Sequence, residues 1–243
     1  MRPKIGITLD HDRDQTRYQV NYNCVRAVVA AGGEPLLLPF YDDAPLPDSI
    51  NGLILTGGND PDPAAWGEEW HPACTRVDPR RERHERALAT QAEQRGLPAL
   101  GICFGMQVMN LVRGGTLIQH LDQGGNDAKW DDHTKGNEGY SRRHPLQIAE
   151  NSVLSGVMRG VSASINTNHH QALGKIGKGL AAVGWAPDGV VEAIEDASRP
   201  FWIGVQWHPE HQADEPAQSA LFEALVEAAR GGGGAANVPR GTS

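Results

Sequence analysis

One cysteine of the chain stands between glycines, at a point where the sequence pattern changes. Cys103 lies within the stretch LGICFGMQ, directly after a short apolar run and directly before residues at helical spacing. The glycines at 101 and 105 permit the sharp strand-to-helix turn of a G-x-S-x-G nucleophile elbow. Free N–H groups and the dipole of a helix N-terminus favour a thiolate. The spacing therefore indicates a nucleophile, while a buried structural thiol is the plainer alternative.

A nucleophile that attacks a carbonyl needs hydrogen-bond donors for the oxygen that becomes charged. The N–H of Phe104, the residue after the cysteine, is expected to be one donor. The pair Gly57-Gly58 ends another apolar run and, lacking side chains, would let a substrate carbonyl approach a second N–H. An ordinary turn that ends a strand is the alternative interpretation of this pair.

A cysteine nucleophile also needs a base, and the base needs a group that orients it. The stretch QWHPEH supplies His208 and Glu210 on either side of Pro209. Proline favours an extended conformation at the residue before it, and in an extended segment residues two apart point the same way. We therefore expect Glu210 to hold the imidazole of His208. A lone histidine at a strand end is usually a surface residue, but this pairing favours chemistry.

The elements that must position these residues alternate between strand and helix patterns. Apolar runs predict strands at 4–9, 35–40, 52–56, 98–103 and 201–207, and periodic apolar residues predict helices at 22–29, 81–95, 108–112 and 221–226. This order predicts an α/β fold with a doubly wound, mostly parallel central sheet and helices on both faces. Further strands are expected at 144–149, 160–166 and 180–195, after a polar loop at 123–143. We expect one domain over 1–230 and a disordered tail over 231–243.

Composition limits the class of protein. The 243 residues carry a formal charge of −8, which argues against a nucleic-acid surface. Three cysteines, at 24, 74 and 103, do not make a disulfide framework. We find no signal peptide and no apolar run long enough for a membrane helix, so a cytoplasmic protein without membrane partners is expected. The ten histidines form no H-E-x-x-H or zinc-finger spacing, so no metal is expected.

Three separated stretches give the chain a family resemblance. GICFGMQ, LTGGND and GVQWHPE occur in the chain, and together they resemble the class I glutamine amidotransferase superfamily over nearly the whole chain, up to about Ala229. The resemblance implies a three-layer, flavodoxin-like fold with a Cys-His-Glu triad. AVVAAGGEPLLLP, GGNDPDPAAWGEE, DPRRERHERAL, NLVRGGTLIQHL and NTNHHQAL are similar to the γ-glutamyl-γ-aminobutyrate hydrolase branch.

The resemblance implies a role for each residue that matches a family motif. The implied site is Cys103 as nucleophile, His208 as base and acid, Glu210 as its orienter, Gly57, Gly58 and Phe104 at the oxyanion, Gln107 at the α-amino-acid end of the substrate, and His170 and Gln171 on a loop near the pocket. One departure concerns specificity. Hydrolases of this branch often carry Arg after the nucleophile, where this chain has Phe104.

The function that the resemblance implies is hydrolysis of a small γ-glutamyl amide, such as γ-glutamyl-γ-aminobutyrate, through a thioester and without a cofactor. It would belong to polyamine catabolism. One alternative is a glutaminase subunit that delivers ammonia to a partner synthetase, although no fused synthetase is seen in the sequence. Another alternative is a non-catalytic binding protein with the same fold. The identity of the leaving amine and the oligomeric state, including a homodimer, are left open.

Overall fold

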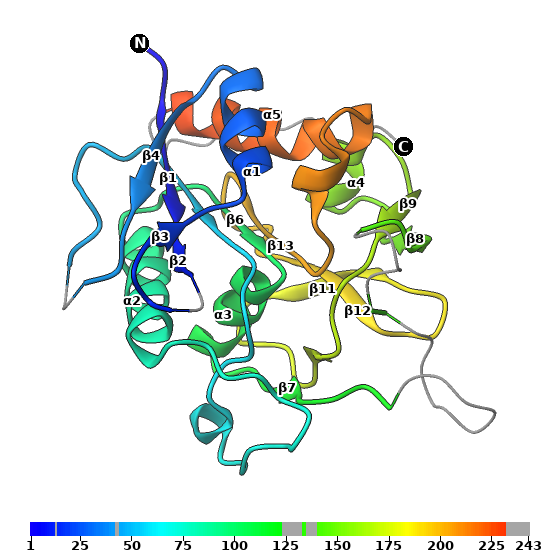
Figure 1. Ribbon diagram of the computed structural model, residues 1–243. Helices are drawn as coiled ribbons and strands as arrows, with labels where there is room; N and C mark the ends of the chain where they lie inside the picture. Colours follow the sequence, from blue (N-terminus) through cyan, green and yellow to red (C-terminus); the bar gives the residue numbers. More distant parts are fainter. Residues whose placement is uncertain (13, 42–43, 123–132, 135–139, 232–243) are drawn as a thin grey trace.

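The computed structural model describes residues 1–12, 14–41, 44–122, 133–134 and 140–231. A nine-stranded sheet forms its centre, in the order β4-β1-β5-β6-β13-β12-β11-β8-β9. The strands of the sheet are β1 (Lys4–Thr8), β4 (Glu34–Leu38), β5 (Gly52–Leu55), β6 (Ala99–Ile102), β8 (Arg143–Ile148), β9 (Ser162–Asn166), β11 (Ala181–Trp185), β12 (Val191–Glu195) and β13 (Trp202–Val205). The first strands in this order, β4, β1, β5, β6 and β13, pair in parallel. The remaining strands, β12, β11, β8 and β9, continue the sheet in antiparallel pairs (Figure 1).

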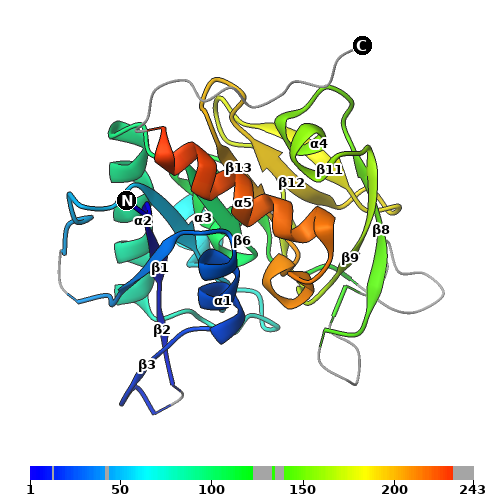
Figure 2. The same ribbon diagram turned by 90° about the horizontal axis from the view of Figure 1, so that it is seen from above.

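Helices cover both faces of this sheet (Figures 1 and 2). One face carries α1 (Tyr22–Ala30), α4 (Val153–Met158) and α5 (Pro216–Arg230), and the other carries α2 (Pro79–Gln94) and α3 (Phe104–Val112). The α/β fold with helices on both faces, as expected from the sequence, is confirmed. None of the described helices is long and apolar enough to cross a membrane.

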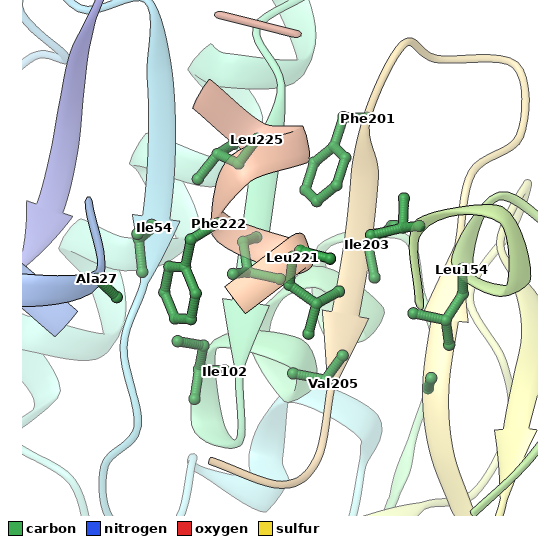
Figure 3. Packing of buried hydrophobic residues seen from close by; sticks show 14 of the residues in the cluster. Ala27, Ile54, Ile102, Leu154, Phe201, Ile203, Val205, Leu221, Phe222 and Leu225 are labelled. Atoms are coloured by element: carbon green, nitrogen blue, oxygen red, sulfur yellow. The ribbon is translucent and has the colours of Figure 1, made fainter. Parts of the chain in front are cut away.

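Strand alternation divides the core between the two faces. In β6, Leu100 and Ile102 pack under α1 and α5, while Ala99 packs with α2 and α3. Figure 3 shows the first of these clusters, with Phe222 of α5 lying beside Ile102 and Ile54. Side chains of a strand point alternately to the two faces, so a run that is apolar throughout marks a strand buried on both. This burial fixes the carboxyl ends of β5, β6 and β13 side by side.

Several short elements were absent from the sequence-based expectations. They are β2 (Asp10–His11), β3 (Tyr18–Gln19), β7 (Leu117–Ile118), β10 (Ala172–Leu173), α4 and the 3₁₀ helices η1 (Pro63–Trp66) and η2 (Pro209–Gln212). Elements of two to six residues carry too few positions for a period to be recognised. Most of the loop expected at 123–143, and the tail expected at 231–243 beyond residue 231, lie outside the described residues.

Candidate active site

The turn at Cys103 is a strained strand-to-helix elbow. Cys103 separates β6 from α3 and has φ 52° and ψ −106°, a backbone conformation that non-glycine residues rarely adopt. A Cβ on Gly105 would lie 2.2 Å from the carbonyl oxygen of Leu55, and one on Gly101 would lie 2.7 Å from the backbone of Gly105. The two glycines are therefore required by close backbone packing, while the cysteine itself carries the strain of about 1–3 kcal/mol that often accompanies function.

A cleft of about 430 Å³ opens at this elbow, beyond the carboxyl ends of the parallel strands. Its lining residues are Asp10, Gln19, Val20, Asn21, Cys24, Thr56, Gly57, Gly58, Cys103, Tyr140, Asn168, His208 and Glu210. The structure thus brings together the cysteine, the histidine, the glutamate and the glycine pair that the sequence indicated, from three segments distant along the chain.

His208 and Glu210 form a buried pair in the cleft. The Nδ1 atom of His208 lies 2.8 Å from Oε1 of Glu210, and both side chains are less than a tenth exposed. Residues 209–212 form the 3₁₀ helix η2 rather than an extended segment. The expectation of a pair across Pro209 is thus met, but the reason given for it was wrong. The 3₁₀ turn, and not strand alternation, directs the carboxylate back toward the ring.

The electrostatics of His208 favour its charged form. Burial disfavours the imidazolium, but the Glu210 carboxylate and a hydrogen bond with Cys103 outweigh it, and the pKa of His208 is raised well above its ordinary value. An imidazolium in this position can pair with a thiolate and can give its proton to a leaving group. Behind the sulfur, the side-chain amide of Gln206 donates to Sγ at 3.4 Å. The arrangement is suited to a thiolate–imidazolium pair.

Asn166, at the end of β9, fixes the backbone of His208. Its side-chain Nδ2 donates to the carbonyl of His208 at 2.7 Å, and its Oδ1 accepts from the N–H of His208 at 2.9 Å. On the open side, the ring of Tyr140 lies 4.8 Å from that of His208, centroid to centroid. Sequence reasoning missed both residues. They lie far from His208 along the chain, so no local pattern in the sequence indicates them.

A buried arginine on α2, Arg81, orients the peptide bond between Gly57 and Gly58. The Nη2 group of Arg81 donates to the carbonyl of Gly57 at 2.7 Å, and no peptide bond of the described chain is cis. In a planar trans peptide the carbonyl and the following N–H point in opposite directions. With the Gly57 carbonyl turned toward Arg81, the N–H of Gly58 is directed away from Arg81, and Gly58 itself lines the cleft. Arg81 is therefore a positioning residue for the expected oxyanion donor.

The ring of Phe104 also contacts Arg81. It is fully buried, and the guanidinium carbon of Arg81 lies 5.0 Å from its centroid. The side chain of residue 104 thus lies under α2 and does not line the cleft. The sequence resemblance drew attention to this position because hydrolases of the γ-glutamyl-γ-aminobutyrate branch often have Arg there. In this chain it is a core position next to an arginine from another helix. We did not expect a charged helix such as α2 to bury residues this deeply.

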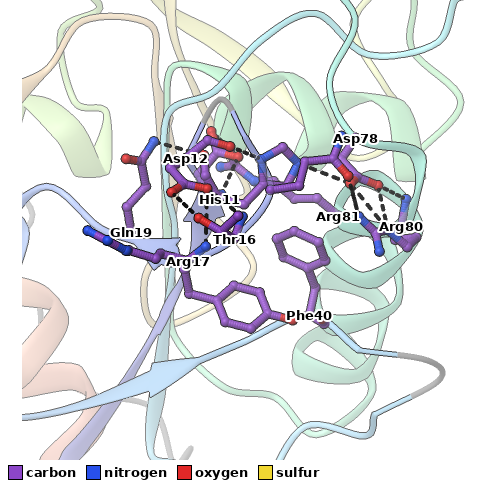
Figure 4. Close-up of polar contacts among 12 residues, drawn as sticks. His11, Asp12, Thr16, Arg17, Gln19, Phe40, Asp78, Arg80 and Arg81 are labelled. Atoms are coloured by element: carbon purple, nitrogen blue, oxygen red, sulfur yellow. Dashed lines mark hydrogen bonds and ion pairs between the residues drawn. The ribbon is translucent and has the colours of Figure 1, made fainter.

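The hairpin β2–β3 forms one wall of the cleft and is held by the N-terminus of α2. Figure 4 shows His11, a residue of β2, beside Asp78, with its Nε2 atom 3.0 Å from the carboxylate. Asp78 also caps α2, accepting from the backbone N–H of Arg80. Hydrogen bonds from the Arg80 side chain lower the pKa of Asp78 to about 2. Gln19, which lines the cleft, donates to the carbonyl of His11 at 2.9 Å.

Three residues that the sequence placed at the substrate lie outside the lining of the cleft. Gln107 is buried and donates to Gln206, so it reaches the sulfur only through that second amide. His170 points toward Asp60, with Nε2 3.0 Å from the nearer carboxylate oxygen. Gln171 is buried and donates to Cys74 at 3.5 Å. From the same loop, Asn168 lines the cleft instead.

The other two cysteines have different surroundings. Cys24 lines the cleft, but burial, together with the Glu210 charge, raises the pKa of its thiol well above the ordinary value. Cys74 is half-buried beside Gln119 and Gln171, and burial raises its pKa as well. Both are held as neutral thiols. Only Cys103 combines a helix N-terminus with an imidazolium.

Comparison with known proteins places the chain among proteins of one family. The family model of peptidase C26 matches residues 3–210. A "Putative glutamine amidotransferase" of Mycobacterium tuberculosis is 43% identical over 84% of this chain and 65% of its own length. The chain therefore spans slightly less than two thirds of that relative. The γ-glutamyl-γ-aminobutyrate hydrolase PuuD of Escherichia coli is 29% identical over 93% of each chain.

A solved structure supports the fold. The crystal structure of a "putative gmp synthase subunit a protein" from Thermoplasma acidophilum superposes with a TM-score of 0.67, covering 95% of this chain and 96% of the other. Its sequence is 16% identical, so this likeness concerns the fold alone.

Proposed function

Because the chain belongs to the peptidase C26 family of the class I glutamine amidotransferase superfamily, we propose that it is a free-standing hydrolase of γ-glutamyl amides. The proposed substrates are small compounds such as γ-glutamyl-γ-aminobutyrate, the substrate that names one of its relatives. The observation that carries the proposal is the strained Cys103 elbow, which faces the buried His208–Glu210 pair across one cleft.

In the first half of the reaction, the Cys103 thiolate attacks the γ-carbonyl carbon. The electron pair of the carbonyl moves to its oxygen, where the N–H groups of Phe104 and Gly58 would hold it. One such donor is worth about 3 kcal/mol of barrier. The imidazolium of His208 gives its proton to the nitrogen of the leaving amine as the C–N bond breaks. The products of this half are the free amine and a γ-glutamyl thioester on Cys103.

In the second half, water replaces the amine. The neutral His208 removes a proton from the water as its oxygen attacks the thioester carbon. The C–S bond breaks, glutamate leaves, and the thiolate–imidazolium pair is restored. Glu210 holds the ring at Nδ1 and would stabilise the positive charge that forms on it. The chain's own residues supply the nucleophile, the acid and base, and the oxyanion donors of this scheme.

The lining of the cleft suggests how the glutamyl end is held. The amides of Gln19, Asn21 and Asn168 can donate to the α-carboxylate, and Asp10 offers a carboxylate for the α-ammonium group. Among the described lining residues there is no Lys or Arg. A leaving amine that bears its own carboxylate, such as γ-aminobutyrate, would therefore be held by amide donors, whereas a neutral or cationic amine needs no anion-binding group.

A panel of γ-glutamyl amides tests this function. The purified chain is assayed for glutamate release from γ-glutamyl-γ-aminobutyrate, γ-glutamyl diamines and glutamine, with Cys103→Ala as the control. We expect unaided turnover of the first two classes and none by the control. Glutaminase activity that appears only when a synthetase is added would replace this proposal with an ammonia-delivering subunit. No turnover of any amide, with Cys103 unreactive toward a glutamine-like diazoketone, would indicate a binding protein.

A further inference from the structure

A second group of polar side chains lies buried in the antiparallel half of the sheet, away from the reacting atoms. It consists of His133, His144 at the start of β8, His169 after β9, and Glu192 in β12. Glu192 is fully buried, and the side chains of His133 and His169 are 1% and 2% exposed. The ligand atoms of His133, His144 and Glu192 lie within 4.8 Å of one another.

In two of these rings, the nitrogen that does not face Glu192 is a hydrogen-bond donor to a backbone carbonyl. Nδ1 of His144 lies 2.9 Å from the carbonyl oxygen of Pro145, and Nδ1 of His169 lies 2.9 Å from that of Gln171. A carbonyl oxygen only accepts, so each Nδ1 carries the hydrogen. In the neutral ring, Nε2 then presents a lone pair toward Glu192.

His133 is oriented in the manner of many metal ligands. Its Nε2 lies 2.9 Å from a carboxylate oxygen of Asp188, while its Nδ1 faces Oε1 of Glu192 at 3.4 Å and the hydroxyl of Thr167 at 3.5 Å. A histidine that binds a metal through one nitrogen typically gives the other to a carboxylate or a carbonyl, which fixes the ring and raises its basicity.

The ring nitrogens and the carboxylate oxygens that face one another in this group do not form hydrogen bonds with one another. Nε2 of His144 and Nε2 of His169 lie 3.6 Å and 3.3 Å from Oε1 of Glu192. Neither nitrogen, and neither oxygen of Glu192, has a hydrogen-bond partner. In a tetrahedral zinc site with bonds of 2.0–2.1 Å, neighbouring ligand atoms are about 3.3–3.5 Å apart. Nδ1 of His133 and Nε2 of His144, at 3.4 Å and 3.6 Å from Oε1 of Glu192, are spaced from the carboxylate as two ligands of one ion would be.

Three of these residues are placed so that one divalent ion could join them. The ligand atoms of His133, His144 and Glu192 lie within 4.8 Å of one another, and His169 faces the same carboxylate oxygen, with Nε2 at 3.3 Å. We propose that His133, His144 and Glu192 bind one Zn²⁺ ion in a structural site.

The proposed site would stabilise one wall of the catalytic cleft. It joins β8 and β12, and His169 of the loop after β9 faces the same carboxylate. In that loop Asn168 lines the cleft, and three residues before His169 stands Asn166, which holds the backbone of His208. The ion would have no contact with substrate. Its loss would act through the position of His208.

Metal analysis of the untagged full chain tests the site. The chain is stripped of metal with a chelator and incubated with Zn²⁺. Unbound metal is then removed, and the bound metal is measured by elemental mass spectrometry. We expect about one Zn²⁺ per chain, and a tetrahedral visible spectrum with Co²⁺. Glu192→Gln and His144→Ala should retain less than about a tenth of that metal and lose the rise in Tm that Zn²⁺ gives the unmodified chain. His120→Ala serves as control and should bind as the unmodified chain does.

The control addresses a competing location. His71, His120 and His170 form an exposed group of rings that could collect metal adventitiously. Loss of binding in His120→Ala, with retention in His144→Ala, would contradict the proposal. So would an unmodified chain, folded by circular dichroism, that binds neither Zn²⁺ nor Co²⁺. The Zn²⁺ and Co²⁺ measurements on the unmodified chain do not depend on any variant. A variant that fails to fold therefore cannot protect the proposal.

Discussion

The imidazole of His208 and the carboxylate of Glu210 meet at 2.8 Å, although only one residue separates them. The 3₁₀ helix η2 makes this possible, since it turns the chain directly after His208. Asn166 holds the backbone of the same histidine through two hydrogen bonds. The ring is thus fixed both at its backbone and at Nδ1, which leaves Nε2 for the sulfur and the substrate.

Replacing Glu210 by Gln should preserve the fold and remove the charge behind the ring. We expect kcat/KM for a γ-glutamyl amide to fall by about 10²–10⁴-fold, since the imidazolium loses its counter-charge and its preferred tautomer. Steady-state kinetics measure the effect. Glu223→Gln, an exposed change on α5, is the matched control and should keep full activity. A loss of less than tenfold in Glu210→Gln would remove the carboxylate from the proposed triad.

The pH profile should report the charge on His208. Burial lowers its pKa, but Glu210 and Cys103 more than offset this, so the pKa of His208 is raised. We expect the alkaline limb of kcat/KM to lie well above about 6.5, the ordinary imidazole value, and to move down in Glu210→Gln. An alkaline limb at the ordinary value in both proteins would contradict the raised pKa.

The same shift has a consequence for stability. Since the folded pKa of His208 is raised, its stabilising contribution is complete below the unfolded value of about 6.5 and is lost as pH rises through the folded pKa. Thermal unfolding of the unmodified chain and of His208→Gln should therefore differ most at low pH. The difference in Tm should shrink as pH rises. A difference that grows with pH would reverse the sign and refute the assignment.

Arg81→Lys should impair the oxyanion donor while keeping a buried positive charge. Lysine cannot contact Asp10, Glu85 and the Gly57 carbonyl together, as the guanidinium does. We expect kcat to fall by about 10–10²-fold with KM nearly unchanged, because the donor acts in the transition state. The exposed Arg83→Lys on the same helix is the control. An unchanged kcat in folded Arg81→Lys would mean that the Gly57–Gly58 peptide is positioned by other contacts.

Gly57→Ala should obstruct the catalytic histidine. A Cβ at this position would lie 2.7 Å from Cε1 of His208, closer than atoms pack. The ring must then shift, and a displacement of about 1 Å costs about 10²-fold in rate. Gly160→Ala is the control, since its nearest neighbour would be 3.8 Å away. Equal rates for Gly57→Ala and the unmodified chain, with both folded, would show that the ring works from another position.

The residues that local sequence could reveal are those whose neighbours along the chain explain them. Cys103 stands between glycines, and His208 stands two residues from Glu210, so motif and partner are read together. The strands that carry them are apolar runs, which burial on both faces requires. The parallel core and the helices on either face were predictable for that reason.

Residues that act across the fold left no such signal. Arg81 lies in a charged segment that resembles a surface helix, yet it is fully buried against Phe104 and the Gly57 carbonyl. Asn166 reaches His208 from 42 residues away. Likewise, His169 and His170 are adjacent and point to different partners, Glu192 and Asp60. Only the sheet topology brings such side chains to their partners.

The most direct test of the account is the identity of the atom that carries the glutamyl group during turnover. The chain is mixed with a γ-glutamyl amide, quenched in acid within the steady state, digested and analysed by peptide mass spectrometry. The account predicts a γ-glutamyl thioester on the peptide that contains Cys103, and none on those with Cys24 or Cys74. Turnover with the adduct on another residue, or with Cys103 unmodified throughout, would contradict it.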